Sequence, residues 1–290
     1  MELEDSRVTI VGLGLMGGSM ALGLQPRCRK LVGVDSDPKT IALARRAGIM
    51  TQELSGALVH TDVLVLATPV KETLRLLELF TEDPPDVNLL MDIGSTKRQV
   101  VEAMELLPDS VSAVGGHPLC GKERAGFSEA EAGLFSGNLF VLTPCSRTTP
   151  SALALAEQIV VALGASVRQM EAARHDRLLA AASHLPYLLA AALMGSAESF
   201  GRRDPELWDL VASGFLSTSR LAASDLTMMI DILTTNQDMV QEALSRAQAE
   251  LEQLRKLLAE GEAGPLRGYL EPVQRRRDSL KDPGGSARGI

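Results

Sequence analysis

Cysteine, histidine and aromatic residues are scarce in this chain of 290 residues, which contains 3 cysteines, 4 histidines and 3% aromatic residues. The isolated cysteines Cys28, Cys120 and Cys145 exclude a disulfide framework and fit a reducing compartment. With so few aromatic residues, alanine and leucine supply most of the packing, which favours helices over an all-β architecture. We expect no metal site.

Positive charge is also in short supply. The chain has 29 lysine and arginine residues against 37 aspartate and glutamate residues, a formal net charge of −8. This balance argues against nucleic acid and anionic membranes as partners, and the short cluster Arg275-Arg276-Arg277 does not change it. The first residues, MELEDSR, are acidic where a signal peptide would be basic, so we predict a cytoplasmic protein.

One apolar run, residues 178–197, has the length of a membrane span. It contains Ser183, His184 and Pro186 near its middle and lacks flanking aromatic anchors. We therefore predict a buried helix rather than a membrane anchor.

Short apolar runs alternate with helical patterns in the first half of the chain. The runs typical of strands occupy residues 7–12, 31–35, 62–68, 89–94, 111–116, 138–144 and 165–170. Continuous apolar strands separated by helices indicate a parallel sheet that is covered on both faces. From Glu171 onward only helical periodicity is evident. We predict an α/β protein, with a Rossmann-type, doubly wound, mostly parallel sheet in residues 1–170 and an all-helical domain in residues 171–290.

A glycine-rich turn follows the first predicted strand, in the stretch VTIVGLGLMGGSM. Gly12, Gly14 and Gly17 fit the pattern G-x-G-x-x-G, which combines a tight turn, close approach of the backbone to a pyrophosphate and close helix–strand packing. Asp35 ends the second strand about 20 residues on, where a carboxylate binds ribose hydroxyls and repels a 2′-phosphate, so NAD is favoured over NADP. The predicted cofactor contacts are Gly12, Gly14, Leu15, Met16, Gly17, Asp35, Thr68 and Pro69.

The glycine turn, Asp35 and Pro69 have simpler alternatives. The glycine turn could serve packing alone, with Asp35 as the cap of a helix that starts near Pro38. Pro69 could merely start the next helix.

Two polar residues follow later strands at the edge of the sheet where ligands bind in such folds. Ser95 lies in DIGSTKRQV, where Thr96 and Gln99 fit a capping box for the next helix. His117 follows the strand 111–116, and its glycine and proline neighbours are expected to keep it out of regular structure. A neutral imidazole at this edge can accept a proton, whereas a histidine in an ordinary turn is more often structural.

Five motifs, in order, resemble the prephenate/arogenate dehydrogenase family of tyrosine biosynthesis. They are GLGLMGGSMA, DIGSTK, GGHPLCGKERAG, HDRLLAAASHLPYLLAAAL and SGFLSTSRLAASD. The resemblance implies NAD-dependent oxidative decarboxylation of prephenate to 4-hydroxyphenylpyruvate, or of arogenate to tyrosine. It also implies a homodimer through the alanine- and leucine-rich helices at 178–197 and 217–258.

The resemblance also assigns roles to single residues. His117 would accept a hydrogen bond from the ring C4 hydroxyl as hydride leaves C4, and Ser95 would orient the imidazole or the cofactor. Arg220 would hold the ring carboxylate that departs as carbon dioxide, with Glu123 as its partner, since a guanidinium matches a carboxylate through two hydrogen bonds. Without the resemblance, Arg220 would be interpreted as part of a surface salt bridge. The predicted substrate contacts are Arg220, Glu123, Tyr187 and His184, although a core role is the simpler interpretation of His184.

The chain departs from the family pattern where the substrate side chain is recognised. Tyr187 replaces a histidine that many members carry, Leu216-Ser217 replaces a common Arg-Asp, and Met229 replaces a tryptophan of some members. These differences leave the choice between prephenate and arogenate open.

Two other functions are weaker alternatives. A β-hydroxyacid dehydrogenase also opens with G-L-G-x-M-G but needs a catalytic lysine, and after residue 122 this chain has only Lys256 and Lys281, in charged surroundings. A protein that binds NAD without turnover would not need the set of Ser95, His117 and Arg220.

Overall fold

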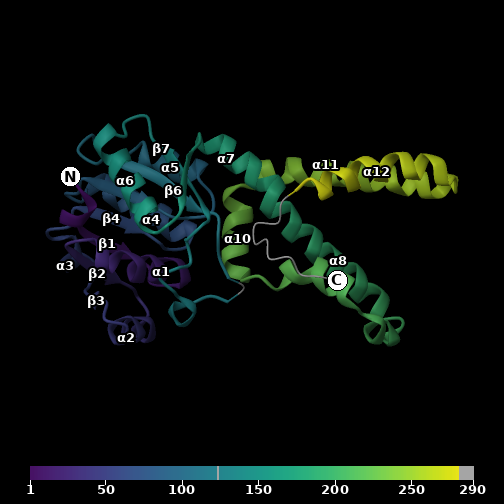
Figure 1. Ribbon diagram of the computed structural model, residues 1–290, viewed down its shortest axis with the longest axis horizontal. Helices are drawn as coiled ribbons and strands as arrows, with labels where there is room; N and C mark the ends of the chain where they lie inside the picture. Colours follow the sequence, from purple (N-terminus) through teal and green to yellow (C-terminus); the bar gives the residue numbers. More distant parts are fainter. Residues whose placement is uncertain (123, 281–290) are drawn as a thin grey trace. The chain divides into compact units, whose positions relative to one another are not determined.

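The computed structural model describes residues 1–122 and 124–280, in two compact units: residues 1–240, and a second unit that begins at Gln241. The first unit contains an eight-stranded sheet with the order β3-β2-β1-β4-β5-β6-β7-β8 (Figure 1). The strands are β1 Arg7–Val11, β2 Lys30–Val34, β3 Met50–Thr51, β4 Val63–Leu66, β5 Leu89–Asp92, β6 Ala113–Pro118, β7 Leu139–Pro144 and β8 Ser166–Gln169.

The sheet is mostly parallel, as predicted. Every neighbouring pair is parallel except β6 and β7, which run antiparallel. The predicted apolar runs correspond to all strands but β3, whose two residues are too few for a pattern to reveal.

Helices of the same chain cover both faces of the sheet. One face carries α1 Leu15–Leu24, α2 Pro38–Arg46 and α6 Pro150–Ala162, and the other carries α3 Leu54–Leu58, α4 Val70–Glu82 and α5 Arg98–Met104. Successive strand residues enter opposite core clusters, as Ile10 and Val11 do, because side chains alternate along a strand. This is a doubly wound arrangement.

The described residues after β8 form helices joined by short turns, without a strand. The helices of this part are α7 Ala172–Leu179, α8 Leu185–Gly201, α9 Ser213–Ser219, α10 Leu226–Thr235, α11 Gln237–Glu260 and α12 Ala263–Asp278. A π-helical turn η4, Ala180–His184, joins α7 and α8 into one helix, and the 3₁₀ turns η5 Pro205–Leu210 and η6 Arg220–Ala223 flank α9. Three further 3₁₀ turns are η1 Leu3–Asp5, η2 Gln25–Arg27 and η3 Phe127–Glu129. Within the second unit, Tyr269 of α12 donates a hydrogen bond to Glu250 of α11.

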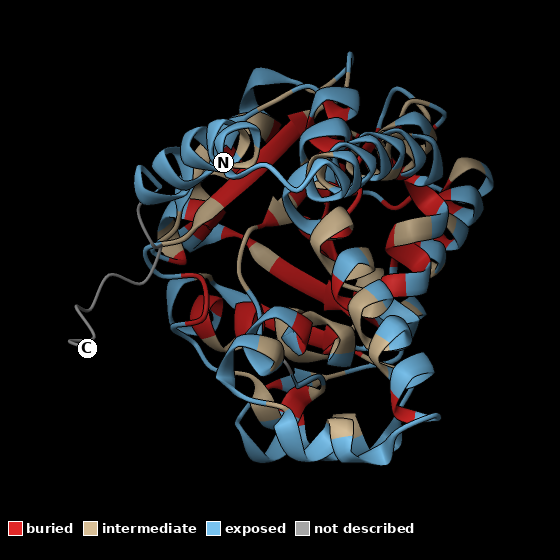
Figure 2. Cartoon of the chain, turned by 90° about the vertical axis from the view of Figure 1, so that its right-hand side faces the viewer, coloured by how far each residue is buried: buried red, intermediate tan, exposed pale blue. Residues whose placement is uncertain are grey.

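The prediction that residues 178–197 form a buried helix is wrong for the single chain. The helix Ala172–Gly201 is long and apolar enough to cross a membrane by length and composition, and only 17% of its most apolar window is buried. Within α8 only Ala190 and Gly201 are buried, and Leu189 and Phe200 are exposed. Composition alone cannot tell whether an apolar helix is covered by its own chain or by another surface. Figure 2 shows the strands largely in red and wide pale blue areas on the helices.

Candidate active site

The glycine-rich turn between β1 and α1 is tightly packed except at one point. Gly12 has a φ of +92°, and a Cβ there would lie 2.6 Å from the Ala67 carbonyl oxygen. A Cβ on Gly17 would lie 1.9 Å from the Gly12 carbonyl oxygen, whereas one on Gly14 would meet nothing within 4 Å. The absence of a side chain at Gly12 and Gly17 therefore allows the turn to pack tightly, and Gly14 leaves open space before the start of α1. The backbone N–H groups at the start of a helix can bind a phosphate when there is open space in front of them.

Asp35 is fixed beside this turn at the end of β2. Its Oδ2 accepts a hydrogen bond from the Leu13 N–H at 2.7 Å, and its Oδ1 accepts one from the Asp37 N–H at 2.8 Å. Asp37, not Asp35, caps α2, since its carboxylate accepts from the N–H groups of Lys39 and Thr40. The alternative role of Asp35 as a helix cap is therefore wrong.

The other predicted cofactor contacts lie at the same edge of the sheet. Leu15 and Met16 form the first turn of α1. Thr68 follows β4 and its hydroxyl bonds to that of Thr73 at 2.9 Å, while Pro69 is the residue directly before α4. Since β1, β2 and β4 are adjacent and parallel, their carboxyl ends bring these residues to one edge.

His117 lies inside β6, where it pairs with Val141 of β7. The prediction that it stands outside regular structure is wrong, because the antiparallel strand β7 pairs with β6 as far as Pro118. Gly116 makes this position possible, since a Cβ there would lie 2.6 Å from the Asp92 carbonyl oxygen. His117 is half-buried near the carboxyl end of its strand.

Two buried residues of α7 continue from His117 in a hydrogen-bonded chain. The Nδ1 atom of His117 lies 2.8 Å from Nε2 of His175, and Nδ1 of His175 lies 2.7 Å from Oδ1 of Asp176. Both His175 and Asp176 are fully buried. A carboxylate accepts only, so His175 carries its proton on Nδ1 and accepts from Nδ1–H of His117. Nε2 of His117 is then left without a proton and can act as an acceptor.

The surroundings of His117 keep its imidazole neutral. Burial lowers its pKa well below the ordinary value of 6.5, and electrostatic interaction with the neighbouring basic side chains of His175, Lys97 and His184 lowers it further. An imidazole that is neutral at pH 7 is a base rather than a cation.

A buried ion pair lies between the end of β5 and the start of α5. Lys97 contacts the Asp92 carboxylate, and both side chains are fully buried. Asp92 also accepts from the N–H groups of Gly94 at 2.8 Å and Gly116 at 3.2 Å. Burial raises the pKa of Asp92 and lowers that of Lys97. The pair fixes the backbone next to His117.

The predicted capping box of α5 does not form. Thr96 instead bonds to the hydroxyl of Thr235 at 2.8 Å. The cap comes from Asp176, whose two oxygens accept from the N–H groups of Lys97 at 2.8 Å and Arg98 at 2.9 Å. One carboxylate thus orients His175 and caps a helix of the sheet region.

The remaining predicted residues have different surroundings. Ser95 is half-buried in the loop between β5 and α5, on the edge to which β6 also leads. His184 is buried with Nδ1 3.3 Å from Nδ2 of Asn236, and burial lowers its pKa to about 4 despite the Asp176 carboxylate. Tyr187 is half-buried on α8.

Arg220 opens η6, which packs against α8, and its side chain is exposed. Its predicted partner Glu123 lies outside the described residues.

No sequence pattern predicted roles for Asp92, Lys97, His175, Asp176 and Asn236. The sequence feature that could have pointed to two of them is the pair His175-Asp176, which begins the motif HDRLLAAASHLPYLLAAAL. Its contact with His117 spans 58 residues of sequence, so no local pattern reveals it.

The comparisons with known proteins cover most of the chain. Residues 20–169 match the family described as prephenate dehydrogenase, nucleotide-binding domain, and residues 171–272 match prephenate dehydrogenase, dimerization domain. The prephenate dehydrogenase of Bacillus subtilis is 29% identical over 287 residues, which cover 96% of this chain and 77% of the relative.

Two solved structures are similar over nearly the whole chain. A prephenate dehydrogenase from A. aeolicus, solved with hydroxyphenyl propionate and NAD+, has a TM-score of 0.87 and 28% identity and covers 97% of this chain and 100% of its own. An arogenate dehydrogenase from Synechocystis has a TM-score of 0.80 and 29% identity and covers 94% of this chain and 99% of its own.

Proposed function

The chain belongs to the prephenate dehydrogenase family and is an NAD-dependent oxidoreductase, and we propose that it converts prephenate to 4-hydroxyphenylpyruvate and carbon dioxide. The observation that carries this proposal is the hydrogen-bonded chain from Asp176 through His175 to His117, on the sheet edge that the glycine turn shares. This chain of hydrogen bonds orients the neutral imidazole of His117 at the edge of the sheet where the cofactor would bind.

The dinucleotide fits the glycine turn as the structure has it. Open space at Gly14 admits a pyrophosphate, and the fixed carboxylate of Asp35 is available to ribose hydroxyls. When bound, NAD+ accepts the hydride. Gly12 and Gly17 keep the turn in the required shape.

His117 acts on the ring hydroxyl of the substrate. In the proposed reaction, its Nε2 accepts a hydrogen bond from the C4 hydroxyl. As hydride leaves C4, the hydroxyl becomes more acidic and this hydrogen bond strengthens. The bond therefore stabilises the transition state more than the bound substrate. The bond to the ring carboxylate then breaks, its electron pair completes the aromatic ring, and carbon dioxide departs.

The other site residues keep the roles that the resemblance implies. We assign Ser95 to orienting His117 or the cofactor, and Arg220 with Glu123 to the ring carboxylate. Tyr187 is assigned to the substrate side chain, with His184 behind it. The proposed division places cofactor binding in residues 1–170, and substrate binding and dimerisation in residues 171–290.

A homodimer explains the exposed apolar surface of α8. The matched family domain is one that dimerises, and the same helix contains His175, Asp176 and His184, which are held by polar contacts that lipid could not provide. We infer a cytoplasmic homodimer that acts on a small molecule, without nucleic acid or membrane as a partner.

Arogenate is the second candidate substrate. The sequence identity to the arogenate dehydrogenase, 29%, is as high as the 28% to the prephenate enzyme, and Tyr187 stands where many members of the family have histidine.

One assay separates the candidates. The protein is mixed with prephenate or arogenate, and with NAD or NADP, and reduced nicotinamide is followed by absorbance. We expect turnover of prephenate with NAD; turnover of arogenate alone selects the second candidate, and no turnover with either substrate rejects both.

A further inference from the structure

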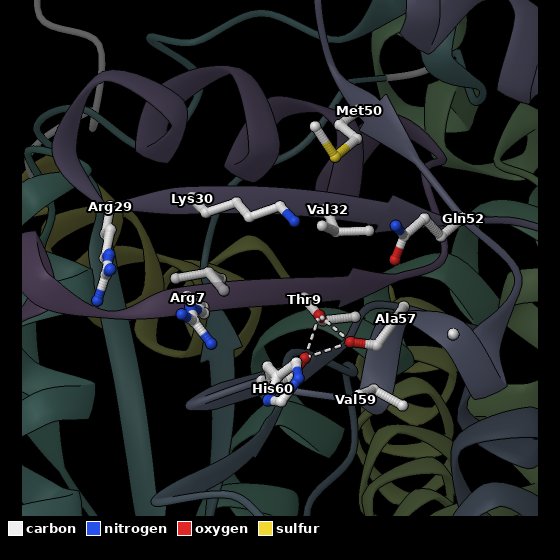
Figure 3. Close-up of a pocket in the computed structure, with 13 residues that line it drawn as sticks. Arg7, Thr9, Arg29, Lys30, Val32, Met50, Gln52, Ala57, Val59 and His60 are labelled. Carbon is white, nitrogen blue, oxygen red and sulfur yellow. Dashed lines mark hydrogen bonds between the residues drawn. The ribbon is translucent and has the colours of Figure 1, made fainter.

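A cavity of about 550 Å³ opens at the amino ends of the first strands (Figure 3). It is lined by the starts of β1 and β2, by the short strand β3, and by α3 with the loop that follows it. The cofactor turn lies at the other end of the same strands, so a five-residue strand of about 16 Å separates the two places. None of the roles proposed above uses this cavity.

Positive charge is concentrated on one wall of the cavity. Arg7 and Lys30 are directly opposite each other in the parallel pair of β1 and β2, and Arg29 precedes Lys30. Like charges placed opposite each other in a sheet repel and destabilise it.

Among the described residues, no carboxylate forms an ion pair with these three side chains. The ion pairs among the described residues involve other basic residues, from Lys71 to Arg267. The Asp62 carboxylate, which is next to the start of β1, accepts from the backbone N–H of Arg7 at 2.8 Å. The side chains of Arg7, Arg29 and Lys30 are therefore available to an anion from solution.

The rest of the cavity suits the organic part of a small molecule. Val32 forms part of the floor, and the exposed side chains of Met50 and Val59 form the rim. His60, which follows Val59, has a φ of +66°, a left-handed conformation that non-glycine residues rarely adopt and that clusters at functional sites. α3 has only five residues, which leaves this part of the sheet face uncovered.

We propose that this cavity binds a phosphate-bearing small molecule. Guanidinium groups bind phosphate oxygens through paired hydrogen bonds and the lysine adds a point charge, so Arg7, Arg29 and Lys30 would hold the phosphate. The volume lies within the range of small-molecule sites, and Val32, Met50 and Val59 would contact the remainder of the ligand.

The test is calorimetric titration of inorganic pyrophosphate into protein saturated with NAD+. Saturation fills the phosphate site at the glycine turn, so the titration reports on another site. The double variant R7Q/K30Q is expected to weaken pyrophosphate binding by a factor of about 10 or more, because it removes two charge-assisted contacts. The matched control is R168Q, which removes an exposed arginine from β8 in the same sheet.

A second measurement separates binding from folding. Without ligand and at low salt, R7Q/K30Q is expected to have an unchanged or higher Tm than the wild type, since it relieves repulsion. Equal pyrophosphate affinity in the double variant and the wild type would overturn the proposal, as would an equal loss in R168Q. Absence of binding at roughly 10 mM pyrophosphate would also overturn it.

Discussion

The sheet region and the long helix that follows it bury their apolar side chains in different ways. β4 and β5 are buried at every position, because helices of the same chain cover both faces of the sheet. α8 is also strongly apolar, yet it buries only Ala190 and Gly201 within the first unit. The sheet region completes its core within one chain, whereas α8 presents a surface that something else must cover.

The proposed reaction centre takes residues from both regions. His117 belongs to the self-contained sheet, and His175 and Asp176 belong to the helix that continues into α8. Asp176 also caps α5, so the same carboxylate fastens the helix to the sheet. The orientation of the base therefore depends on the junction between the two regions.

The largest effect is expected from changing the base on the sheet side. His117→Asn removes the acceptor of the ring hydroxyl, and we expect kcat to fall by about 10³-fold. The cofactor turn is formed by other residues, so the affinity for NAD+ is expected to stay within about twofold of wild type. Steady-state kinetics and fluorescence titration of NAD+ measure the two quantities. Unchanged kcat would remove His117 from its assigned role.

The next effect tests whether a second copy covers the helical region. Leu189→Asp places a charge on the exposed apolar face of α8, and we expect the dimer Kd to rise by about 100-fold in sedimentation equilibrium. Leu106→Asp is the control, because Leu106 is exposed in the turn that follows α5 in the sheet region. A wild-type protein that sediments as a monomer would contradict the inferred homodimer.

Sequence patterns were sufficient for the sheet because its signals are local. Apolar runs such as residues 62–68 identify buried strands, and the glycine pattern that starts at Gly12 identifies the turn. β3 was not predicted, because two residues are too few to show a periodicity. The exposure of α8 was not predicted, because composition does not say which surface covers a helix.

The features of the site that were not predicted depend on contacts between residues far apart in the sequence. The capping box at Thr96 failed because Asp176, 79 residues away from Lys97, supplies the cap. His117 was placed outside its strand because the partner β7 follows only after a long loop. The predicted catalytic residues lie within sequence motifs, whereas the residues that orient them are distant in the sequence.

A smaller effect is expected from the helical side of the junction. His175→Leu leaves His117 in place but removes the acceptor that fixes its tautomer, so we expect kcat to fall roughly 10- to 100-fold. Because His175 helps to keep the pKa of His117 low, the acid limb of the kcat/KM profile should also move to higher pH. KM for NAD+ should not change. A lowered kcat with an unmoved pH profile would reduce His175 to a packing residue.

The smallest effect concerns stability in acid. Burial lowers the pKa of His184 to about 4 from the ordinary 6.5, so between these values the unfolded chain binds more protons than the folded one. The free energy of unfolding should therefore be undiminished above pH 6.5 and fall by about 3 kcal/mol, through this residue, as the pH is lowered to 4. His184→Gln removes the titrating group, so its unfolding free energy should depend less steeply on pH in urea titrations. His60→Gln, at an exposed position, serves as the control. Equal slopes for the wild type and His184→Gln would mean that His184 is not held neutral by the junction.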